Sequence, residues 1–156
     1  MAMTPSGKDK ALRPSTSMKV IPMVKMPPEV KEVLQKQKPT PIATAAKDGT
    51  PNVVFIGFLK VLDEENIMIG DNFFNKTAKN LEENPRISIL CYDAESKRSY
   101  QIKGTVKVHK SGPRFEEMRK WVHGANPKMP AKSCVMVKVE GVYDSLWGPE
   151  AGKKIA

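Results

Sequence analysis

Apolar and polar residues alternate along several stretches of the chain, and this period of two predicts β-strands. The clearest case is SCVMVKVEGVYD, residues 133–144, where Val135, Val137 and Val139 occupy alternate positions. The segment SYQIKGTVKVH, residues 99–109, alternates in the same way. Alternate residues of a strand face opposite sides of its sheet. We therefore expect both segments to be strands with one buried face.

A hairpin is predicted earlier in the chain. The segment TPIATAAK, residues 40–47, runs into Asp48-Gly49, and NVVFIGFLKVL, residues 52–62, follows it. Asp-Gly between two apolar runs is a strong hairpin signal. We expect residues 52–62 to form one strand. The segments IMIG, residues 67–70, and RISILCY, residues 86–92, add two further predicted strands.

Three segments instead have helical spacing or helical start and stop signals: PPEVKEVLQKQ at residues 27–37, FFNKTAKNLEENP at 73–85 and GPRFEEMRKWV at 112–122. Two of them begin with proline, which favours the first helical turn. Six predicted strands with short helices between them, most of them joined by tight turns, indicate a mostly β, antiparallel six-stranded barrel with peripheral helices.

Much of the net charge is carried by the N-terminal segment. The chain has 156 residues and a formal net charge of +9. Residues 1–26 carry five basic residues and one acidic residue, which is +4, so 9 − 4 = +5 remains for residues 27–156. The first segment shows no helical or strand periodicity, so we predict a basic, flexible tail over 1–26 and one domain over 27–156. The tail contains no aromatic residue, which makes nucleic-acid binding an unfavoured function.

The cysteines and apolar runs exclude other classes. Cys91 and Cys134 both fall in predicted strands, with no Cys-x-x-Cys or Cys/His ligand spacing, so neither a disulfide framework nor a metal site is expected. No apolar run is long enough to span a bilayer, and the N-terminus lacks a signal-peptide pattern. We expect a reduced, cytoplasmic protein with no membrane association.

The helix predicted over residues 73–85 has its charges in the unfavourable order. Asn75 is a suitable N-cap and Asn84-Pro85 a stop, yet Lys76 and Lys79 lie near the positive end of the helix dipole, with acidic residues at the negative end. Four such charges cost on the order of 1–3 kcal/mol before screening. A bound anion would turn this free-energy cost into a gain, because free amides, lysine and a threonine hydroxyl together form a phosphate cradle. The alternative is a solvated helix start.

The order of segments from residue 48 to residue 89 resembles the FMN-binding split barrel. That superfamily includes pyridoxamine 5′-phosphate oxidase and the small FMN-binding proteins of anaerobic bacteria and archaea. The most specific piece is NKTAKNLEENPRISI, residues 75–89, which stands where the family has its phosphate-binding helix and the following strand. The resemblance covers roughly residues 27–147.

The resemblance implies an FMN site. It places the phosphate on Lys76 and Thr77, the flavin along the strand after the Asp-Gly turn, and the ring system near the strand end before the helix. The ten implied cofactor contacts are Asn52, Val53, Val54, Phe55, Gly70, Asp71, Asn72, Lys76, Thr77 and Trp147. Gly70 would permit close backbone approach. For Val53, Val54 and Phe55 the alternative is ordinary strand core, and Trp147 equally suits a C-terminal anchor.

The family binds FMN at a two-fold interface, so the resemblance also implies a homodimer, with Trp147 reaching the partner's flavin. Two features of the oxidase itself are missing: an arginine in the strand that here reads PNVVFIG, and a basic motif in the C-terminal SLWGPEAGKKIA. Oxidation of pyridoxamine phosphate is therefore not expected, and no catalytic residue is assigned. Three interpretations stay open: an FMN-dependent oxidoreductase or electron carrier, a coenzyme F420-dependent reductase, and a non-enzymatic flavin-binding protein.

Overall fold

The computed structural model describes residues 24–156, and most of its ordered elements are β-strands. The elements are α1 (Pro28–Lys36), β1 (Thr40–Ala45), β2 (Pro51–Ile56), β3 (Leu59–Val61), β4 (Asn66–Asp71), α2 (Lys76–Glu83), β5 (Arg86–Asp93), β6 (Arg98–His109), α3 (Pro113–Ala125) and β7 (Ser133–Asp144). All three predicted helices and the Asp-Gly hairpin are confirmed, the latter with Gly49 at φ +91°.

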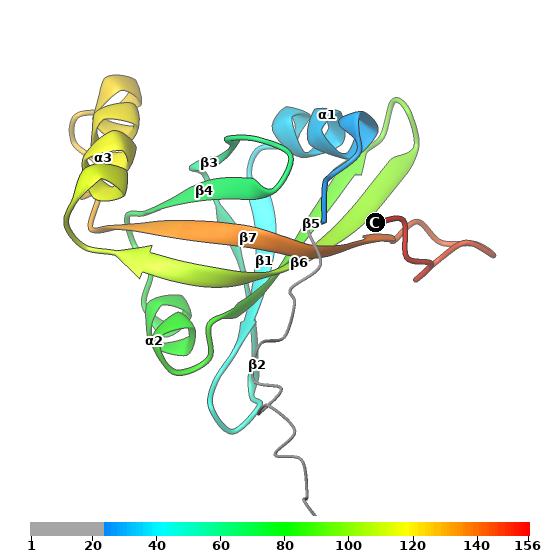
Figure 1. Ribbon diagram of the computed structural model, residues 1–156, viewed down its shortest axis with the longest axis horizontal. Helices are drawn as coiled ribbons and strands as arrows, with labels where there is room; N and C mark the ends of the chain where they lie inside the picture. The colour runs from blue at the N-terminus through cyan, green and yellow to red at the C-terminus, as the bar shows by residue number, and fades with distance from the viewer. Residues whose placement is uncertain (1–23) are drawn as a thin grey trace, which may run out of the picture.

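The strands form one curled antiparallel sheet in the order β2-β1-β5-β6-β7-β4-β3. β2 and β3 are its two edges, yet they follow each other in the chain with only Gly57 and Phe58 between them. Three residue steps span at most about 11 Å, so the two edges must approach each other. They do not pair, and the curled sheet is therefore an antiparallel split barrel, as the resemblance implied (Figure 1).

The prediction of a single strand over residues 52–62 was wrong, and the described chain has seven strands rather than six. The segment instead divides into β2, which pairs with β1, and β3, which pairs with β4. The run is apolar at most positions on both sides of the crossing, and this holds even for Val53 and Phe55, which are exposed in β2. Its sequence pattern therefore shows no break.

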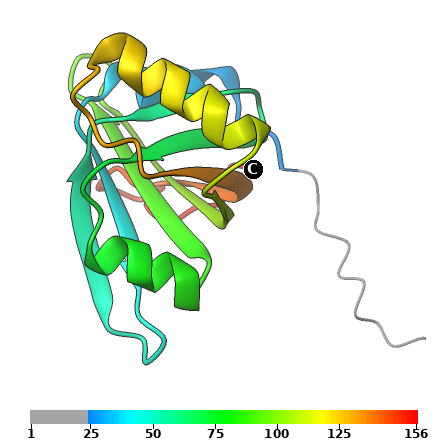
Figure 2. The ribbon, with the colours of Figure 1, turned by 90° about the vertical axis from the view of Figure 1, so that its left-hand side faces the viewer.

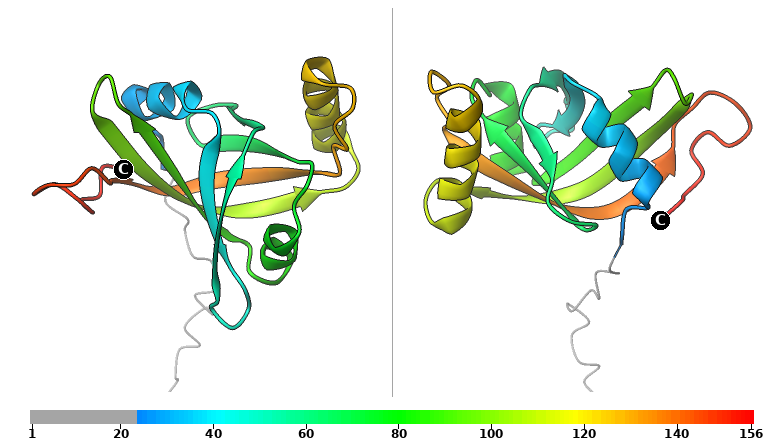
Figure 3. Two further views of the ribbon diagram at one scale, coloured as in Figure 1. Left: turned by 180° about the vertical axis from the view of Figure 1, so that it is seen from behind. Right: turned by 90° about the horizontal axis from the view of Figure 1, so that it is seen from above.

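The helices cover different parts of the sheet. In Figure 1, α1 and α3 lie above the sheet and α2 lies below it. α1 buries Val30, Val33 and Leu34 against β5, β6 and β3. α3 packs on β4 and β7 with Met118 and Val122 buried. The turned view of Figure 2 shows α2 beside β1 and β2, and Figure 3 shows α3 at the end of the sheet away from the C-terminus.

The N-terminal boundary of the domain lies before the predicted one. Of the tail predicted over residues 1–26, residues 1–23 lie outside the described part of the chain. The last three residues belong to the domain, because Val24 and Met26 are buried in the barrel core and the Met26 amide donates to the Glu64 carbonyl at 2.8 Å. Within residues 24–156, no helix is long and apolar enough to cross a membrane.

Candidate functional site

A pocket opens between the edge strand β2 and the start of α2. Its volume is about 350 Å³, within the range of small-molecule sites. We call it the front pocket; its lining residues are Asn52, Val54, Phe55, Ile56, Gly57, Phe58, Gly70, Asn72, Phe73, Phe74, Asn75, Lys76, Thr77 and Met129. Because β2 is an edge strand, the backbone groups on one of its sides have no strand partner.

The N-terminus of α2 supplies the polar end of the front pocket. Asn75 holds the N-cap position, as predicted, but its side chain makes no capping hydrogen bond. The first amide groups of a helix have no partner within the helix. Lys76 follows with an exposed ammonium group, and there is no acidic residue in the first turn. This end of the pocket therefore offers several donors and a positive potential to an anion.

A buried polar network holds Thr77 against β2. The Asn52 amide nitrogen donates to Thr77 Oγ1 at 3.0 Å and to Thr44 Oγ1 at 3.2 Å. Asn80 donates to the same Thr44 oxygen at 3.0 Å. Since the Thr77 oxygen accepts from Asn52, its own proton remains available as a donor. The network thus orients a buried hydroxyl donor beside the exposed Lys76 ammonium group.

The structure brings together most of the residues that the resemblance implied. Seven of the ten line the front pocket: Asn52, Val54, Phe55, Gly70, Asn72, Lys76 and Thr77. They come from β2, from β4 and the turn after it, and from the start of α2. Asn72 is held in place because its side-chain oxygen accepts from the Ala131 amide at 2.9 Å.

The other three residues lie outside the pocket lining. Val53 alternates away from Val54 and is 71% exposed on the outer side of the sheet. Asp71 is buried, with its carboxylate turned to the Phe74 amide at 3.0 Å and the Ser133 hydroxyl at 3.2 Å. Trp147 is 78% exposed in the loop that extends from the barrel after β7 (Figure 1). Its ring lies beside that of Tyr92, at 6.3 Å between centroids.

Gly70 lines the front pocket, but its missing side chain has a packing reason. A Cβ atom at this position would lie 2.9 Å from Val122 Cγ2 of α3 and 3.4 Å from the Phe58 Cβ. The glycine therefore lets α3 pack onto β4. The predicted role in cofactor approach stays a prediction, because the same residue also faces the pocket.

Seven lining residues were not among the predicted cofactor contacts: Ile56, Gly57, Phe58, Phe73, Phe74, Asn75 and Met129. Phe73 and Phe74 directly precede the phosphate-cradle segment, and that adjacency is a usable signal. Phe58 lies at the crossing between the two sheet edges. Met129 comes from the loop between α3 and β7, far along the chain, and has no local signal that connects it with Lys76.

Neither the cysteines nor the histidines line the front pocket. Burial raises the pKa of the Cys91 thiol to about 12 and that of Cys134 to about 11, so neither is a thiolate at neutral pH. The two histidines, His109 and His123, do not line the pocket, and His123 is bonded to the Met129 carbonyl at 2.9 Å. Among residues 24–156, no group of three His, Cys, Asp or Glu side chains is arranged to hold a metal ion.

Comparison with known proteins gives a consistent family match. The family model described as pyridoxamine 5′-phosphate oxidase matches residues 26–145. An uncharacterised protein of Methanocaldococcus jannaschii is 39% identical over 117 residues, covering 74% of this chain and 78% of that protein. The heme oxygenase HutZ of Vibrio cholerae is 32% identical over 72 residues, covering 46% of this chain and 40% of HutZ.

Solved structures share the fold. HupZ of Group A Streptococcus superposes with a TM-score of 0.70 at 26% identity, covering 81% of this chain and 99% of that one. An FMN-binding protein of Syntrophomonas wolfei gives 0.59 at 18% identity, covering 72% and 80%. An F420 reductase gives a TM-score of 0.56 at 17% identity, covering 72% of this chain and 94% of that one. At these lower identities the last two show the fold alone.

Proposed function

The chain belongs to the pyridoxamine 5′-phosphate oxidase family, whose model matches residues 26–145, and on that premise we propose that it is an FMN-binding flavoprotein. FMN binds in the front pocket with its phosphate at the start of α2, and the protein serves as an oxidoreductase or an electron carrier. The observation that supports this most directly is the buried Thr77 hydroxyl beside Lys76 in the first turn of α2. Asn52 holds this hydroxyl by a hydrogen bond, and the N-cap side chain of the helix makes no capping bond.

The residues present suit this cofactor. Lys76, Thr77 and the first amides of α2 would hold a dianionic phosphate, while the edge of β2 and Phe58, Gly70 and Met129 would accept the apolar ring system. When bound, FMN supplies the hydride or electron transfer chemistry. The protein's residues would bind and orient FMN, and the apolar walls of the pocket would keep water from one side of its ring system.

Flavin fits the pocket better than haem does. Haem iron is held by histidine, cysteine, methionine or tyrosine side chains. Neither histidine nor either cysteine lines the front pocket, and Met129 is the one lining residue of these four types. An F420 reductase shares the fold, so a deazaflavin remains the second candidate; the absorption spectrum of the purified protein distinguishes flavin, deazaflavin and haem.

The proposal includes a homodimer. Val53 and Phe55 of β2 are 71% and 70% exposed, and Leu90 and Tyr92 of β5 lie on the same outer side by strand alternation. Trp147 extends this apolar surface beside Tyr92. We call these five residues the outer apolar face. It lies next to the front pocket through Phe55, so a second subunit would cover both the face and the open side of a bound flavin.

The experiment compares two lysines of one helix. Lys76→Ala removes a charge-assisted contact, so FMN should bind about ten- to a hundred-fold more weakly. Riboflavin lacks the phosphate and should bind wild type and variant equally. Lys79→Ala is the matched control, since Lys79 is also exposed on α2 but does not line the front pocket. Fluorescence titration measures the affinities of both ligands for wild type and for both variants, and equal losses of FMN affinity in the two variants would contradict the proposal.

Reduction of the bound flavin then tests the redox role. Mixing the FMN-loaded protein with a reduced nicotinamide or another physiological electron donor in a stopped-flow spectrometer should bleach the flavin absorption band. A flavin that binds at Lys76 and yet is reduced by none of these donors would instead favour the non-enzymatic alternative.

A further inference from the structure

A second cleft continues from the phosphate end of the front pocket. It lies between the turn of the β1–β2 hairpin and one side of α2, and its volume is about 590 Å³. We call it the hairpin cleft; it is lined by Ala46, Lys47, Asp48, Thr50, Pro51, Asn52, Lys76, Lys79, Asn80 and Glu83. Asn52 and Lys76 line both this cleft and the front pocket, so the two spaces meet beside the proposed phosphate site.

Three lysines of the hairpin cleft have no acidic partner. Lys76 and Lys79 are three positions apart on α2 and therefore lie on the same side of the helix, and Lys47 comes from the hairpin turn. Within the described part of the chain, none of the three forms an ion pair. The Asp48 carboxylate is engaged inside the turn, where it accepts from the Thr50 amide at 2.9 Å. The cleft therefore offers cations to an anion next to the phosphate site.

Further along α2 the hairpin cleft presents hydrogen-bond acceptors instead. The Asn80 side chain is 6% exposed, and its nitrogen donates to Thr44 Oγ1 at 3.0 Å. Its oxygen accepts no hydrogen bond from the described residues, yet it is not among the buried unpaired atoms, so it reaches the open cleft. Glu83 follows Lys76 by seven residues, which places it on the same side of the helix about 10 Å further along the axis. One side of α2 thus changes from cations to acceptors.

We propose that the hairpin cleft holds the adenylate half of FAD, so that the protein accepts FAD as well as FMN; this inference rests on the proposed flavin site. The flavin and the first phosphate keep their places in the front pocket, and the second phosphate lies at Lys47 and Lys79. The ribose hydroxyls donate to the Asn80 oxygen and the Glu83 carboxylate, as they do to an acidic residue in dinucleotide-binding folds.

The order of charges along the cleft selects this occupant over a simple anion. Inorganic phosphate or a carboxylate would satisfy the lysines but would bring no donor to the Asn80 oxygen, and it would be repelled by Glu83. A nucleoside diphosphate carries its anionic groups and its hydroxyl donors in the same order as the cations and acceptors of α2. The shared lining at Asn52 and Lys76 connects that nucleotide to the flavin.

The experiment is calorimetric titration of the full-length, flavin-free protein with FMN and with FAD. FAD should bind at least as tightly as FMN, because its second phosphate gains charge-assisted contacts. Weaker binding of FAD than of FMN would overturn this inference and leave the proposed flavin-binding function intact. Binding of neither flavin would contradict both.

Three variants test the location, with FMN as the internal reference for folding. Lys79→Ala should weaken FAD about three- to tenfold and leave FMN unchanged. Thr50→Trp fills the cleft from an exposed position of the hairpin turn and should abolish FAD binding while FMN is retained. Lys110→Ala removes the same charge outside the cleft and should leave both affinities unchanged. Unchanged FAD affinity in both Lys79→Ala and Thr50→Trp, or equal losses of FAD and FMN affinity, would place the adenylate half elsewhere and refute the assignment.

Discussion

Among single residues, Asn52 connects most of the candidate site. It lies on the edge strand β2, lines the front pocket and donates to hydroxyls on both β1 and α2. Its two bonds hold α2 at a fixed distance from the sheet, and they leave the Thr77 proton pointing away from Asn52. The side chain that orients the phosphate donor is therefore on a different element from the donor itself.

Asn52→Ala should weaken FMN binding about tenfold, because Thr77 loses the group that orients its hydroxyl. It should also lower the free energy of unfolding by about 1–3 kcal/mol, since it removes two part-buried hydrogen bonds. Thr44→Ser is the control, because it keeps the acceptor for Asn52 and Asn80. Fluorescence titration and urea unfolding measure the two effects; an Asn52→Ala protein with wild-type FMN affinity would refute the orienting role.

Two glycines that line the front pocket test the packing argument. Gly70→Ala places a methyl group 2.9 Å from Val122 of α3, whereas Gly57→Ala meets no atom within 4 Å. We expect the first to lower the free energy of unfolding by about 1–3 kcal/mol and the second to leave it nearly unchanged. Urea unfolding of both variants without cofactor is the measurement. Similar losses in both would show that α3 does not require the glycine.

Among the helices, α2 keeps its unfavourable charge order in the folded protein. Lys76 and Lys79 are exposed at its start, and no basic residue lies in its last turn. Glu82 is offset only by the exposed pair with Lys110. Solvent reduces the cost of each charge below about 1 kcal/mol, so the fold tolerates the arrangement without an anion. A bound phosphate would make the two lysines at the start of α2 favourable.

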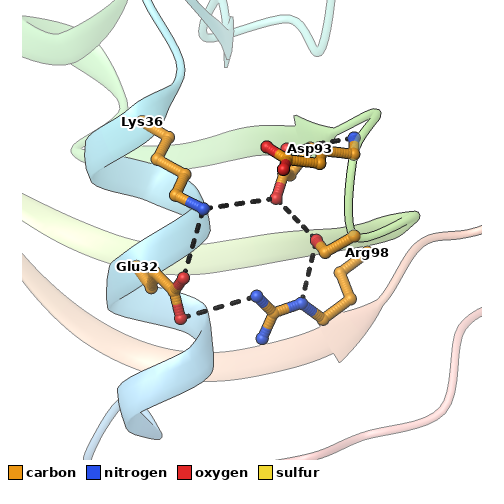
Figure 4. Close-up of polar contacts among 6 residues, drawn as sticks. Glu32, Lys36, Asp93 and Arg98 are labelled. Atoms are coloured by element: carbon orange, nitrogen blue, oxygen red, sulfur yellow. Dashed lines mark hydrogen bonds and ion pairs between the residues drawn. The ribbon is translucent and has the colours of Figure 1, made fainter.

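Helix α1 is joined to the β5–β6 hairpin by a closed ring of polar contacts (Figure 4). Lys36 meets Glu32 at 3.2 Å and Asp93 at 3.7 Å, and Arg98 meets Glu32 at 3.5 Å. Ser96 completes the ring, because it donates to Asp93 at 2.6 Å and accepts from Arg98 at 3.0 Å. The ring connects a helix near the N-terminus to a hairpin far along the chain.

This ring should make thermal stability depend on pH. The bond from Lys36 lowers the pKa of Glu32, and the bond from Ser96 lowers that of Asp93. A carboxyl with a lowered pKa stabilises the fold above its unfolded pKa, and this contribution is lost as pH falls through the folded pKa. The bond with Glu32 raises the pKa of Lys36, so its contribution is lost instead as pH rises through that value.

Glu32→Gln should therefore lower Tm at neutral pH, and this effect should diminish as the pH falls through the lowered pKa of Glu32 in the folded protein. The difference should shrink with added salt, because the groups are exposed. Melting curves from pH 3 to pH 8 measure it. Glu83→Gln, an exposed carboxyl outside the ring, is the control. A Tm difference for Glu32→Gln that stays constant over this range would contradict an ionic role.

For the protein as a whole, the proposed homodimer depends on the outer apolar face. Leu90→Glu places a charge on this face without touching the front pocket lining. We expect the variant to be monomeric by light scattering and to bind FMN more weakly, because a bound flavin would lose its cover. Val108→Glu is the control, since it changes a similarly exposed valine on the other side of the sheet and should leave the dimer intact. A wild-type monomer that retains flavin would refute the proposed dimer.

The amino-acid pattern alone was enough to predict the three helices, the Asp-Gly hairpin and most of the strands. Each depends on interactions between residues close in the chain: the period of two along β6 and β7, the prolines that begin α1 and α3, and the positive φ of Gly49. The lysines at the start of α2 could likewise be identified from neighbouring residues, whereas the sequence did not indicate that the Asn75 side chain makes no capping hydrogen bond.

Only the tertiary structure determined which distant segments meet. The split of residues 52–62 into β2 and β3 follows from the curling of the sheet, which no apolar pattern records. Packing against α3 explains Gly70, and the loop before β7 brings Met129 to a pocket whose other residues precede it by more than fifty positions. Side-chain direction at Asp71 was likewise set by Ser133 and Lys132. Local sequence carries no signal of such contacts, because their partners lie on other elements.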